Sequence, residues 1–221
     1  MQLYGFNKTT LLDYPEHIAA TVFAGGCNFR CPFCHNGDLV LSPDRPPAYA
    51  PEEILAYLTK RKNILDGVCI TGGEPTLQPD LAPFLEQIKK LGLSVKLDTN
   101  GYRPNMLKEL YRAGLIDYVA MDIKGSPDRY PEICGLSRLD FAKIAESVDF
   151  LKSAAMDYEF RTTVVREFHG AEDFRQIGDW IAGARAYYLQ GYQDSPNVIS
   201  PGITAYTLEE LTSFLPLLRD K

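Results

Sequence analysis

The chain lacks the features that mark secreted, membrane-embedded or disulfide-framed proteins. Only five of its 221 residues are cysteine and three are histidine, and an odd cysteine number does not suit a framework of paired disulfides. Its longest apolar runs fall well short of the roughly 20 residues that a membrane-spanning helix requires. The amino terminus has no basic start followed by an apolar core, so no secretory signal is expected. These absences predict a cytoplasmic protein that does not enter a membrane.

A basic excess is also missing. The formal net charge is -6, which disfavours nucleic acid as a partner because nucleic-acid-binding domains are normally basic. Hydrophobic residues make up 45% of the chain and charged residues 24%, as in ordinary globular proteins. We find no internal repeat, low-complexity segment or linker, so the sequence predicts a single domain over residues 1–221.

Short apolar segments alternate with longer amphipathic ones along the sequence. The short segments are rich in Val, Ile, Thr or aromatic residues and are bounded by turn residues, which is typical of β-strands. The longer segments have apolar residues at helical spacing. The expected strands are 18–23, 67–71, 94–99, 118–123, 160–165 and 186–190, and the expected helices are 51–62, 81–92, 105–114, 139–154, 172–183 and 207–219.

This alternation predicts an α/β fold with parallel strands and crossover helices. Apolar residues on both faces of most strands indicate a sheet that is covered on both sides. An open doubly wound sheet and a barrel of βα units both satisfy the pattern. No glycine fingerprint for a dinucleotide follows the first expected strand, because a cysteine-containing loop stands there. We interpret the proline-rich segment 41–51 as an ordered connection within the same domain.

Polar side chains gather where four consecutive expected strands end. The cysteine loop follows the first strand, Glu74 the second, Asp98 lies at the end of the third, and Asp122 and Lys124 at the end of the fourth. In barrels of βα units these strand ends carry the functional groups. Taken singly, Glu74 can charge a helix N-terminus, Asp98 can cap a turn and Lys124 can be a solvated strand end. Taken together, they predict one chemically active face.

The segment GGCNFRCPFCHNG, residues 25–37, holds Cys27, Cys31 and Cys34. Thiols in the cytoplasm are kept reduced, which disfavours a disulfide. A structural zinc site needs four ligands, and the nearest fourth candidate is His35, which directly follows Cys34 and so rarely converges on the same metal. Three thiolates can hold an iron–sulfur cluster while one iron stays free of protein ligands, which suits catalysis. Chance grouping of three core cysteines in a polar loop explains the pattern less well.

The cysteine motif CNFRCPFC resembles the signature of radical S-adenosylmethionine (SAM) enzymes, and GGEP resembles their second motif. Within that family the chain most resembles the activating enzymes of glycyl-radical proteins, through CHN, LDTNG and DIK in order and over nearly its whole length. The resemblance implies a partial (β/α)6 TIM-like barrel, a [4Fe-4S] cluster and a SAM molecule chelated by the open iron. A monovalent cation is a further candidate cofactor.

The resemblance also implies roles for individual residues. The expected metal ligands are Cys27, Cys31 and Cys34. Glu74 and the backbone of two glycines are expected to accept hydrogen bonds from the SAM ammonium, and Lys124 to pair with the SAM carboxylate. Aspartates suit ribose hydroxyls, the ammonium or a cation, and an aromatic ring suits the adenine. The expected cofactor-binding residues are Phe33, Asn36, Gly72, Gly73, Glu74, Asp98, Thr99, Asp122 and Lys124.

The activity implied by this resemblance is reductive cleavage of SAM, followed by removal of a hydrogen atom from a glycine Cα of a partner enzyme. The stretch LLDYPEHIAATVF favours anaerobic ribonucleoside-triphosphate reductase as that partner over pyruvate formate-lyase, whose activators carry Asp-Gly-Pro-Gly where residues 13–16 stand here. A flavodoxin or ferredoxin is the expected electron donor. Three alternatives stay open: an activator of pyruvate formate-lyase or another glycyl-radical enzyme, a radical SAM enzyme that acts on a small molecule, and a non-catalytic metal-binding module.

Several other residues have no firm assignment from the sequence. The segment 125–135, after the fourth expected strand, is a candidate partner-sensing loop. Cys69 lies within an expected strand and is assigned to the core. The sequence gives no settled role to Cys134, Arg161, His169 and Gln190.

Overall fold

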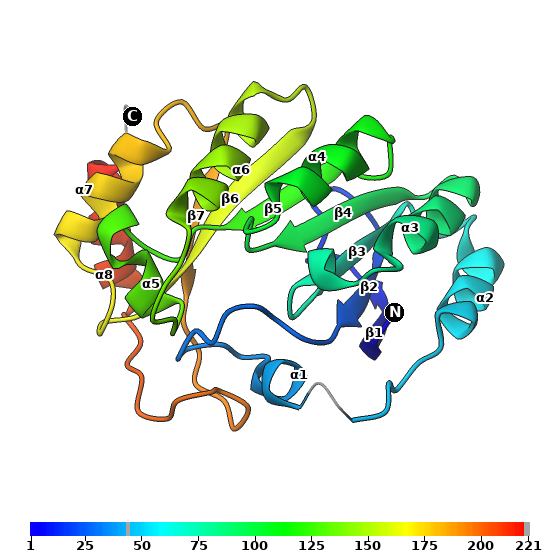
Figure 1. Cartoon of the computed structure of the whole chain (residues 1–221), viewed down its shortest axis with the longest axis horizontal. Helices are drawn as coiled ribbons and strands as arrows, with labels where there is room; N and C mark the ends of the chain where they lie inside the picture. The colour runs from blue at the N-terminus through cyan, green and yellow to red at the C-terminus, as the bar shows by residue number, and fades with distance from the viewer. Residues whose placement is uncertain (43–44, 219–221) are drawn as a thin grey trace.

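The computed structural model describes residues 1–42 and 45–218. Seven strands form one sheet whose order follows the chain from one edge to the other (Figure 1). The first strand runs antiparallel to the second, and all later neighbours are parallel. The strands are β1 (Leu3–Thr10), β2 (Ala19–Ala24), β3 (Gly67–Gly72), β4 (Ser94–Thr99), β5 (Tyr118–Asp122), β6 (Asp157–Val164) and β7 (Tyr187–Gly191).

Helices follow most of the parallel strands. The helix ends carry the residues expected there. For example, α2 begins at Pro51 with two glutamates in its first turn and ends with two basic residues, and these charges interact favourably with the partial charges at the two ends of the helix. No helix within the described ranges is both long and apolar enough to cross a membrane. The helices are α1 (Gly37–Leu41), α2 (Pro51–Arg61), α3 (Leu81–Lys90), α4 (Pro104–Arg112), α5 (Tyr130–Ile133), α6 (Phe141–Ser153), α7 (Ala171–Trp180) and α8 (Leu208–Phe214), with 3-10 turns at Pro75–Leu77, Pro127–Arg129 and Leu215–Leu217.

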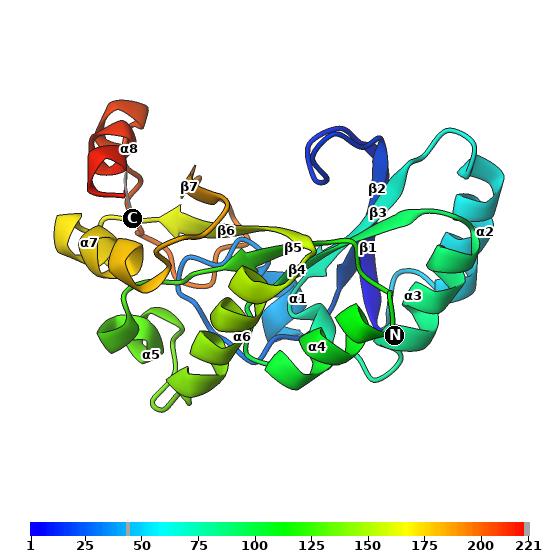
Figure 2. The same ribbon diagram turned by 90° about the horizontal axis from the view of Figure 1, so that it is seen from above.

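The strand order decides between the two folds that the sequence left open. In a doubly wound sheet the order reverses where the chain turns back, whereas here each strand pairs with the next along the chain. Helices α3, α4 and α6 accordingly lie on one side of the curved sheet (Figure 2), as crossovers of one hand require. Among the described strands β1 and β7 do not pair. The fold is therefore an open, partial barrel.

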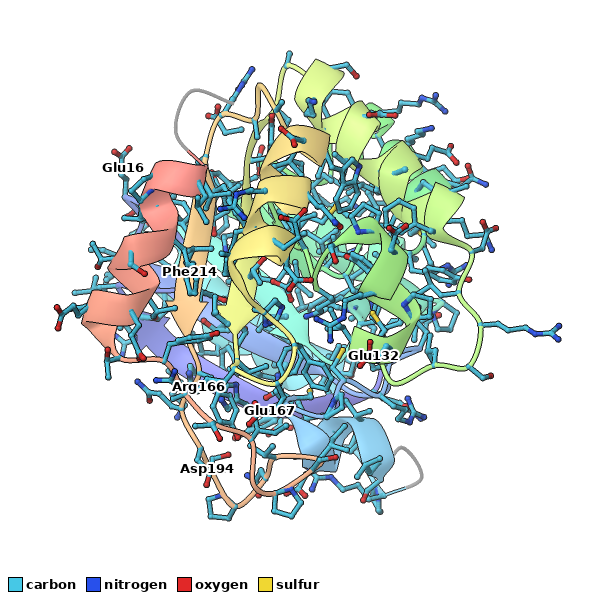
Figure 3. All side chains as sticks on the ribbon, turned by 90° about the vertical axis from the view of Figure 1, so that its left-hand side faces the viewer. Glu16, Glu132, Arg166, Glu167, Asp194 and Phe214 are labelled. Atoms are coloured by element: carbon cyan, nitrogen blue, oxygen red, sulfur yellow. The ribbon has the colours of Figure 1, made fainter. Side chains whose placement is uncertain are left out.

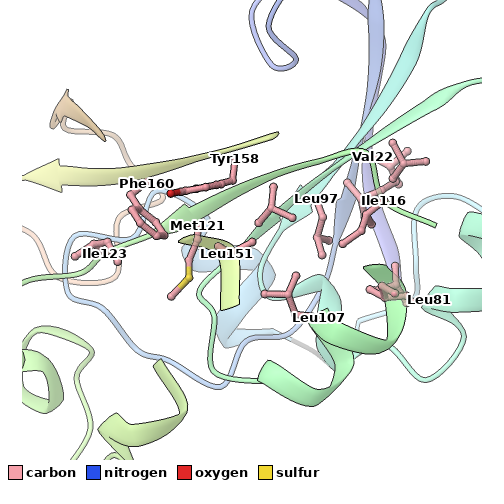
Figure 4. Packing of buried hydrophobic residues seen from close by; sticks show 14 of the residues in the cluster. Val22, Leu81, Leu97, Leu107, Ile116, Met121, Ile123, Leu151, Tyr158 and Phe160 are labelled. Carbon is pink, nitrogen blue, oxygen red and sulfur yellow. The ribbon is translucent and has the colours of Figure 1, made fainter. Parts of the chain in front are cut away.

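The two faces of the sheet differ in chemistry. Side chains alternate along a strand, so Leu97 and Met121 face the helices and belong to the apolar core, which Figure 4 shows with Val22. The inner face carries polar residues, among them Lys96 and Arg161. Lys96 is ion-paired with Asp98 and Arg161 with Asp122. The expectation of apolar residues on both faces is therefore wrong for β4 to β6, whose inner positions include charged residues, whereas the inner positions of β2 and β3 are uncharged, as at Phe23 and Cys69.

The expected elements correspond to most of the observed ones. The six expected strands are β2 to β7, and β4 has the expected bounds. The expected helix 207–219 is shorter than predicted, because α8 ends at Phe214 and a 3-10 turn follows; residue 219 lies outside the described residues. In the described part of segment 41–51, Tyr49 pairs with Leu3 in a β-bridge, as an ordered connection should. The edge strand β1 was not predicted.

Candidate functional site

A cavity opens at the carboxyl ends of the parallel strands, where the expected chemical groups meet. Every residue of the predicted set except Glu74 lines it: Cys27, Cys31, Phe33, Cys34, Asn36, Gly72, Gly73, Asp98, Thr99, Asp122 and Lys124. Three residues of β6 and β7 also line it, namely Arg161, Thr163 and Gln190. The sheet thus brings side chains that are far apart in the sequence to one site.

The loop after β2 holds the three cysteines against this cavity. Phe29 and Phe33 alternate with the cysteines and are 2% and 3% exposed, so their rings anchor the loop in the core. The Arg30 N–H donates to the carbonyl oxygen of Cys134 at 2.8 Å, which ties the loop to the end of α5. The backbone is therefore held on both sides while the loop thiols line the cavity.

The donor set of this loop fits a multi-iron cluster better than a single metal ion. Across residues 1–42 and 45–218, no three Cys, His, Asp or Glu side chains lie close enough together to hold one ion. In a cubane cluster each cysteine sulfur binds a different iron, so the three sulfurs need not converge on one point. His35 does not complete a zinc site, because its Nε2 lies 2.5 Å from the carbonyl oxygen of Gln193. The loop fits a [4Fe-4S] cluster, and a zinc ion does not suit it.

The loop thiols differ in how readily they ionise. Burial raises the pKa of Cys27 to about 12 and also raises the pKa of Cys34. The pKa of Cys31 is lowered, mainly by a hydrogen bond with Cys134. Ligation to a metal requires the thiolate, so Cys27 and Cys34 would release protons on binding one. Cluster uptake by this loop would therefore be coupled to pH.

Gly72 and Gly73 are required for a close backbone approach. A Cβ on Gly72 would lie 2.4 Å from the Ala24 carbonyl oxygen, and one on Gly73 would lie 2.0 Å from the Gly26 carbonyl oxygen. Gly72 also has a φ of 112°, a conformation that side chains rarely allow. Its carbonyl oxygen accepts a hydrogen bond from Asn36 Nδ2 at 2.9 Å. The glycines therefore allow β3 to end directly against the cysteine loop.

The Glu74 carboxylate does not face the cavity. It is fully buried and accepts hydrogen bonds from the Thr76 N–H at 3.1 Å, the Thr99 hydroxyl at 2.8 Å and the Asn100 N–H at 2.7 Å. Burial raises its pKa, although these hydrogen bonds oppose the rise. Asn100 Nδ2 in turn donates to Asn28 Oδ1 in the cysteine loop at 2.8 Å. Glu74 therefore joins the ends of β3 and β4 to the cysteine loop, and its expected contact with SAM stays a prediction.

We expect Glu74→Ala to lower the free energy of unfolding by about 3 kcal/mol, because it leaves several buried donors unpaired. Glu74→Gln should lose less, since the amide oxygen still accepts hydrogen bonds. Urea denaturation at pH 7 measures both changes. Glu86→Ala on α3 is the control, because Glu86 is exposed and its loss should cost under about 0.5 kcal/mol. Equal losses at the two positions would contradict the assigned role.

A chain of ion pairs runs along the inner face beside the cavity. Lys96 Nζ lies 2.6 Å from Asp98, and the Arg161 guanidinium lies 3.3 Å from Asp98 and 3.1 Å from Asp122. Lys124 Nζ lies 2.9 Å from Asp122. Burial alone would raise the pKa of Asp122, but Lys124 and Arg161 outweigh it and lower the pKa to about 2. Asp122 is therefore ionised at neutral pH.

Arg161 is one of the cavity-lining residues to which the sequence assigned no role. Its guanidinium bridges Asp98 and Asp122, so a monovalent cation between these carboxylates would have to displace it. The strand register explains the contact. Arg161 of β6 pairs directly with Asp122 of β5, and because paired residues face the same side of a sheet, their side chains meet. An arginine beside a strand-end aspartate could have been predicted from that register.

The candidate partner-sensing segment 125–135 is mostly packed into the protein. Ser126, Tyr130 and Cys134 are at most 1% exposed, while Asp128 and Glu132 are exposed. The segment is joined to the cysteine loop through the backbone of Cys134. Its role in sensing a partner stays a prediction.

The remaining candidates take structural positions. His169 is buried, and its Nε2 lies 2.9 Å from the Lys124 carbonyl oxygen at the edge of the site. Cys69 is fully buried in β3, as expected, with its sulfur 4.0 Å from Lys96 Nζ.

Comparison with known proteins gives consistent relatives. Residues 21–181 match the family model described as the radical SAM superfamily. The chain is 34% identical over 193 residues to a protein of Methanocaldococcus jannaschii whose name describes a glycyl-radical enzyme activating enzyme, covering 86% of this chain and 79% of the relative. It is 33% identical over 156 residues to the pyruvate formate-lyase-activating enzyme of Clostridium pasteurianum, covering 66% of this chain and 64% of that protein.

A solved structure shares the fold at lower identity. Streptococcus suis SuiB bound to its precursor peptide SuiA matches with a TM-score of 0.69 and 16% identity. The match covers 93% of this chain and 46% of SuiB, so the chain spans about half of that structure. At this identity the likeness concerns the fold alone.

Proposed function

The chain belongs to the radical SAM superfamily, and from that premise we propose that it is an activating enzyme that creates a glycyl radical on a partner enzyme. The family implies a [4Fe-4S] cluster and SAM as cofactors. The observation that carries the proposal is one cavity in which three loop thiols meet Asp98, Asp122 and Lys124. The names of two relatives support the glycyl-radical assignment.

The predicted site residues that line the cavity each receive a role in this proposal. When bound, the cluster and SAM supply a carbon-centred radical that removes a hydrogen atom from a glycine Cα. Cys27, Cys31 and Cys34 hold the cluster, and Lys124, oriented by Asp122, binds the SAM carboxylate. Asp98, held in place by Arg161, accepts hydrogen bonds from the ribose or the ammonium group. Phe33, Asn36, Thr99 and the Gly72–Gly73 backbone form the walls that orient SAM and exclude water.

We propose anaerobic ribonucleoside-triphosphate reductase as the partner, with a flavodoxin or ferredoxin as the electron donor in the cytoplasm. The argument is that residues 13–16 read Asp-Tyr-Pro-Glu where activators of pyruvate formate-lyase carry Asp-Gly-Pro-Gly. In this segment Tyr14 is 3% exposed and stacks on His17 with ring centroids 3.9 Å apart, so the tyrosine anchors the connection before β2. Pyruvate formate-lyase is the second candidate, favoured by the Clostridium pasteurianum relative.

The test is glycyl-radical formation under anaerobic conditions. Reconstituted protein is reduced with dithionite and mixed with SAM and either the anaerobic ribonucleoside-triphosphate reductase or the pyruvate formate-lyase of the same organism. We expect an electron paramagnetic resonance signal of a glycyl radical with the reductase, and its loss when the acceptor glycine is replaced by alanine. A signal with pyruvate formate-lyase alone would reassign the partner. A signal with neither enzyme, despite SAM cleavage, would overturn the activase assignment.

A further inference from the structure

The two edges of the sheet are protected to very different degrees. At β1 the pairing with β2 shifts register twice, and Leu3 is bridged to Tyr49. At β7 the pairing with β6 is continuous over all five residues, and no bridge or strand of the described ranges covers its other side. Proteins usually protect an edge strand with charge, proline, a bulge or a covering helix. β7 has none of the first three, and α8 contacts it at Gly191, where Leu211 lies close.

The free side of β7 can be assigned residue by residue. The Phe160 N–H of β6 donates to the Ala186 carbonyl oxygen at 3.0 Å. Backbone polar groups alternate in direction along a strand, so those of Tyr188 and Gln190 also face β6. The N–H and C=O groups of Tyr187, Leu189 and Gly191 therefore point away from the sheet. These groups form a row that can accept another strand.

This free edge lies directly beside the candidate site. Gln190 lines the main cavity, and a second, shallower cavity shares His35, Thr163 and Gln190 with it. The second cavity extends along Gly191 and Asp194 toward the surface. Figure 3 shows β7 between α7 and α8, with Asp194 beyond the end of the strand. A segment paired with β7 would therefore pass the mouth of the cavity.

We propose that an extended, glycine-bearing segment of the partner enzyme adds to the sheet as a strand at the free edge of β7. This inference rests on the proposed activase function and names how the partner is held. Main-chain hydrogen bonds provide affinity in such strand addition, largely independent of sequence. An added strand lies about 4.8 Å from β7, so its residue opposite Gln190 stands at the cavity mouth. Glycine suits this position because no Cβ separates its Cα from the cavity.

Leu189→Pro tests the edge without touching the cavity. Proline removes the outward N–H of residue 189 and places ring atoms where the added strand would lie, while the bonds to β6 from neighbouring residues stay. We expect binding of the anaerobic ribonucleoside-triphosphate reductase, measured by fluorescence anisotropy, to weaken by about tenfold or more. Leu189→Ala is the matched control, because it trims the side chain and keeps the N–H, and it should bind within about threefold of wild type.

Hydrogen exchange on the wild-type protein provides a second readout that does not depend on the folding of the proline variant. Adding the reductase should slow exchange of the Tyr187 and Leu189 amides, which face outward. Unchanged exchange at β7, together with normal binding by Leu189→Pro, would overturn strand addition. If the wild type still forms a glycyl radical on the partner in that case, the proposed activase function stands without it. If the wild type forms no glycyl radical with any candidate partner, the proposed function fails and this inference fails with it.

Discussion

Replacing Cys34 with alanine should remove the iron–sulfur cluster and reduce glycyl-radical formation at least about 100-fold. The expected size follows from metal sites in which even the loss of an outer contact costs 10- to 100-fold in affinity or activity. Cys34 lines the cavity on the same loop as Cys27 and Cys31, and the protein offers no other thiol in that loop. Iron and sulfide content per chain, with the electron paramagnetic resonance spectrum of the reduced protein, measures the loss.

Cys69→Ala is the control for this experiment. Cys69 is buried in β3 and does not line the cavity, so its replacement should leave the iron content near that of the wild type. Its cost should be one of packing, about 1 kcal/mol in the free energy of unfolding. Full iron content in Cys34→Ala, or its loss in Cys69→Ala alone, would contradict the assignment of the loop.

Replacing Arg161 with methionine should lower the free energy of unfolding by about 2 to 3 kcal/mol, because Asp98 and Asp122 each lose one of their two cationic partners and keep only a lysine. The Arg161 side chain is 15% exposed, and its guanidinium lies 3.3 Å from Asp98 and 3.1 Å from Asp122. The Arg161 pKa is raised by these carboxylates against the effect of burial, so the charge persists at any working pH. Urea denaturation at pH 7 measures the loss.

Arg185→Met is the matched control for Arg161→Met. Arg185 pairs with Asp157 at 2.9 Å, but the two side chains are 49% and 77% exposed, and exposed pairs contribute under about 1 kcal/mol. Similar losses for both variants would show that the inner ion pairs contribute no more than surface ones.

The pH dependence of stability gives a second readout for Arg161→Met. Asp122 has its pKa lowered to about 2 from the usual 3.8, so its contribution is present above about pH 4 and is lost as the pH falls toward 2. Removing Arg161 raises that pKa and should make the acid loss of stability shallower.

The parallel part of the fold could be predicted because local signals and the final structure agree. In β4 the alternation of Val95 and Leu97 with Lys96 and Asp98 marks both the strand and its two faces. The charged inner face was not predicted, although the alternation of charged and apolar residues in β4 indicates it. β1 could not be found in the same way, since Lys8 and two threonines make its second half polar and its pairing with β2 depends on distant residues.

The site was predictable where a motif specifies it and not where tertiary packing does. The spacing of the three cysteines predicts that their loop binds metal, and the structure places all three at the cavity. Glu74 was predicted to contact SAM because its position at a strand end is visible in the sequence. Its buried hydrogen bonds with Thr76, Thr99 and Asn100 depend on how separate segments of the chain pack, which the sequence does not show. Arg161 required the register between β5 and β6, which the sequence does not state.

The charged inner face of the barrel also determines how stability responds to temperature. Lys96, Asp98 and Arg161 are 2%, 14% and 15% exposed, so unfolding hydrates them together with the apolar core. Hydration of apolar surface raises the heat capacity, whereas hydration of polar surface lowers it. The heat-capacity change on unfolding is therefore smaller than that of an equally long barrel with an apolar interior. Its stability curve is correspondingly flatter, and the fold loses less stability on cooling away from its optimum.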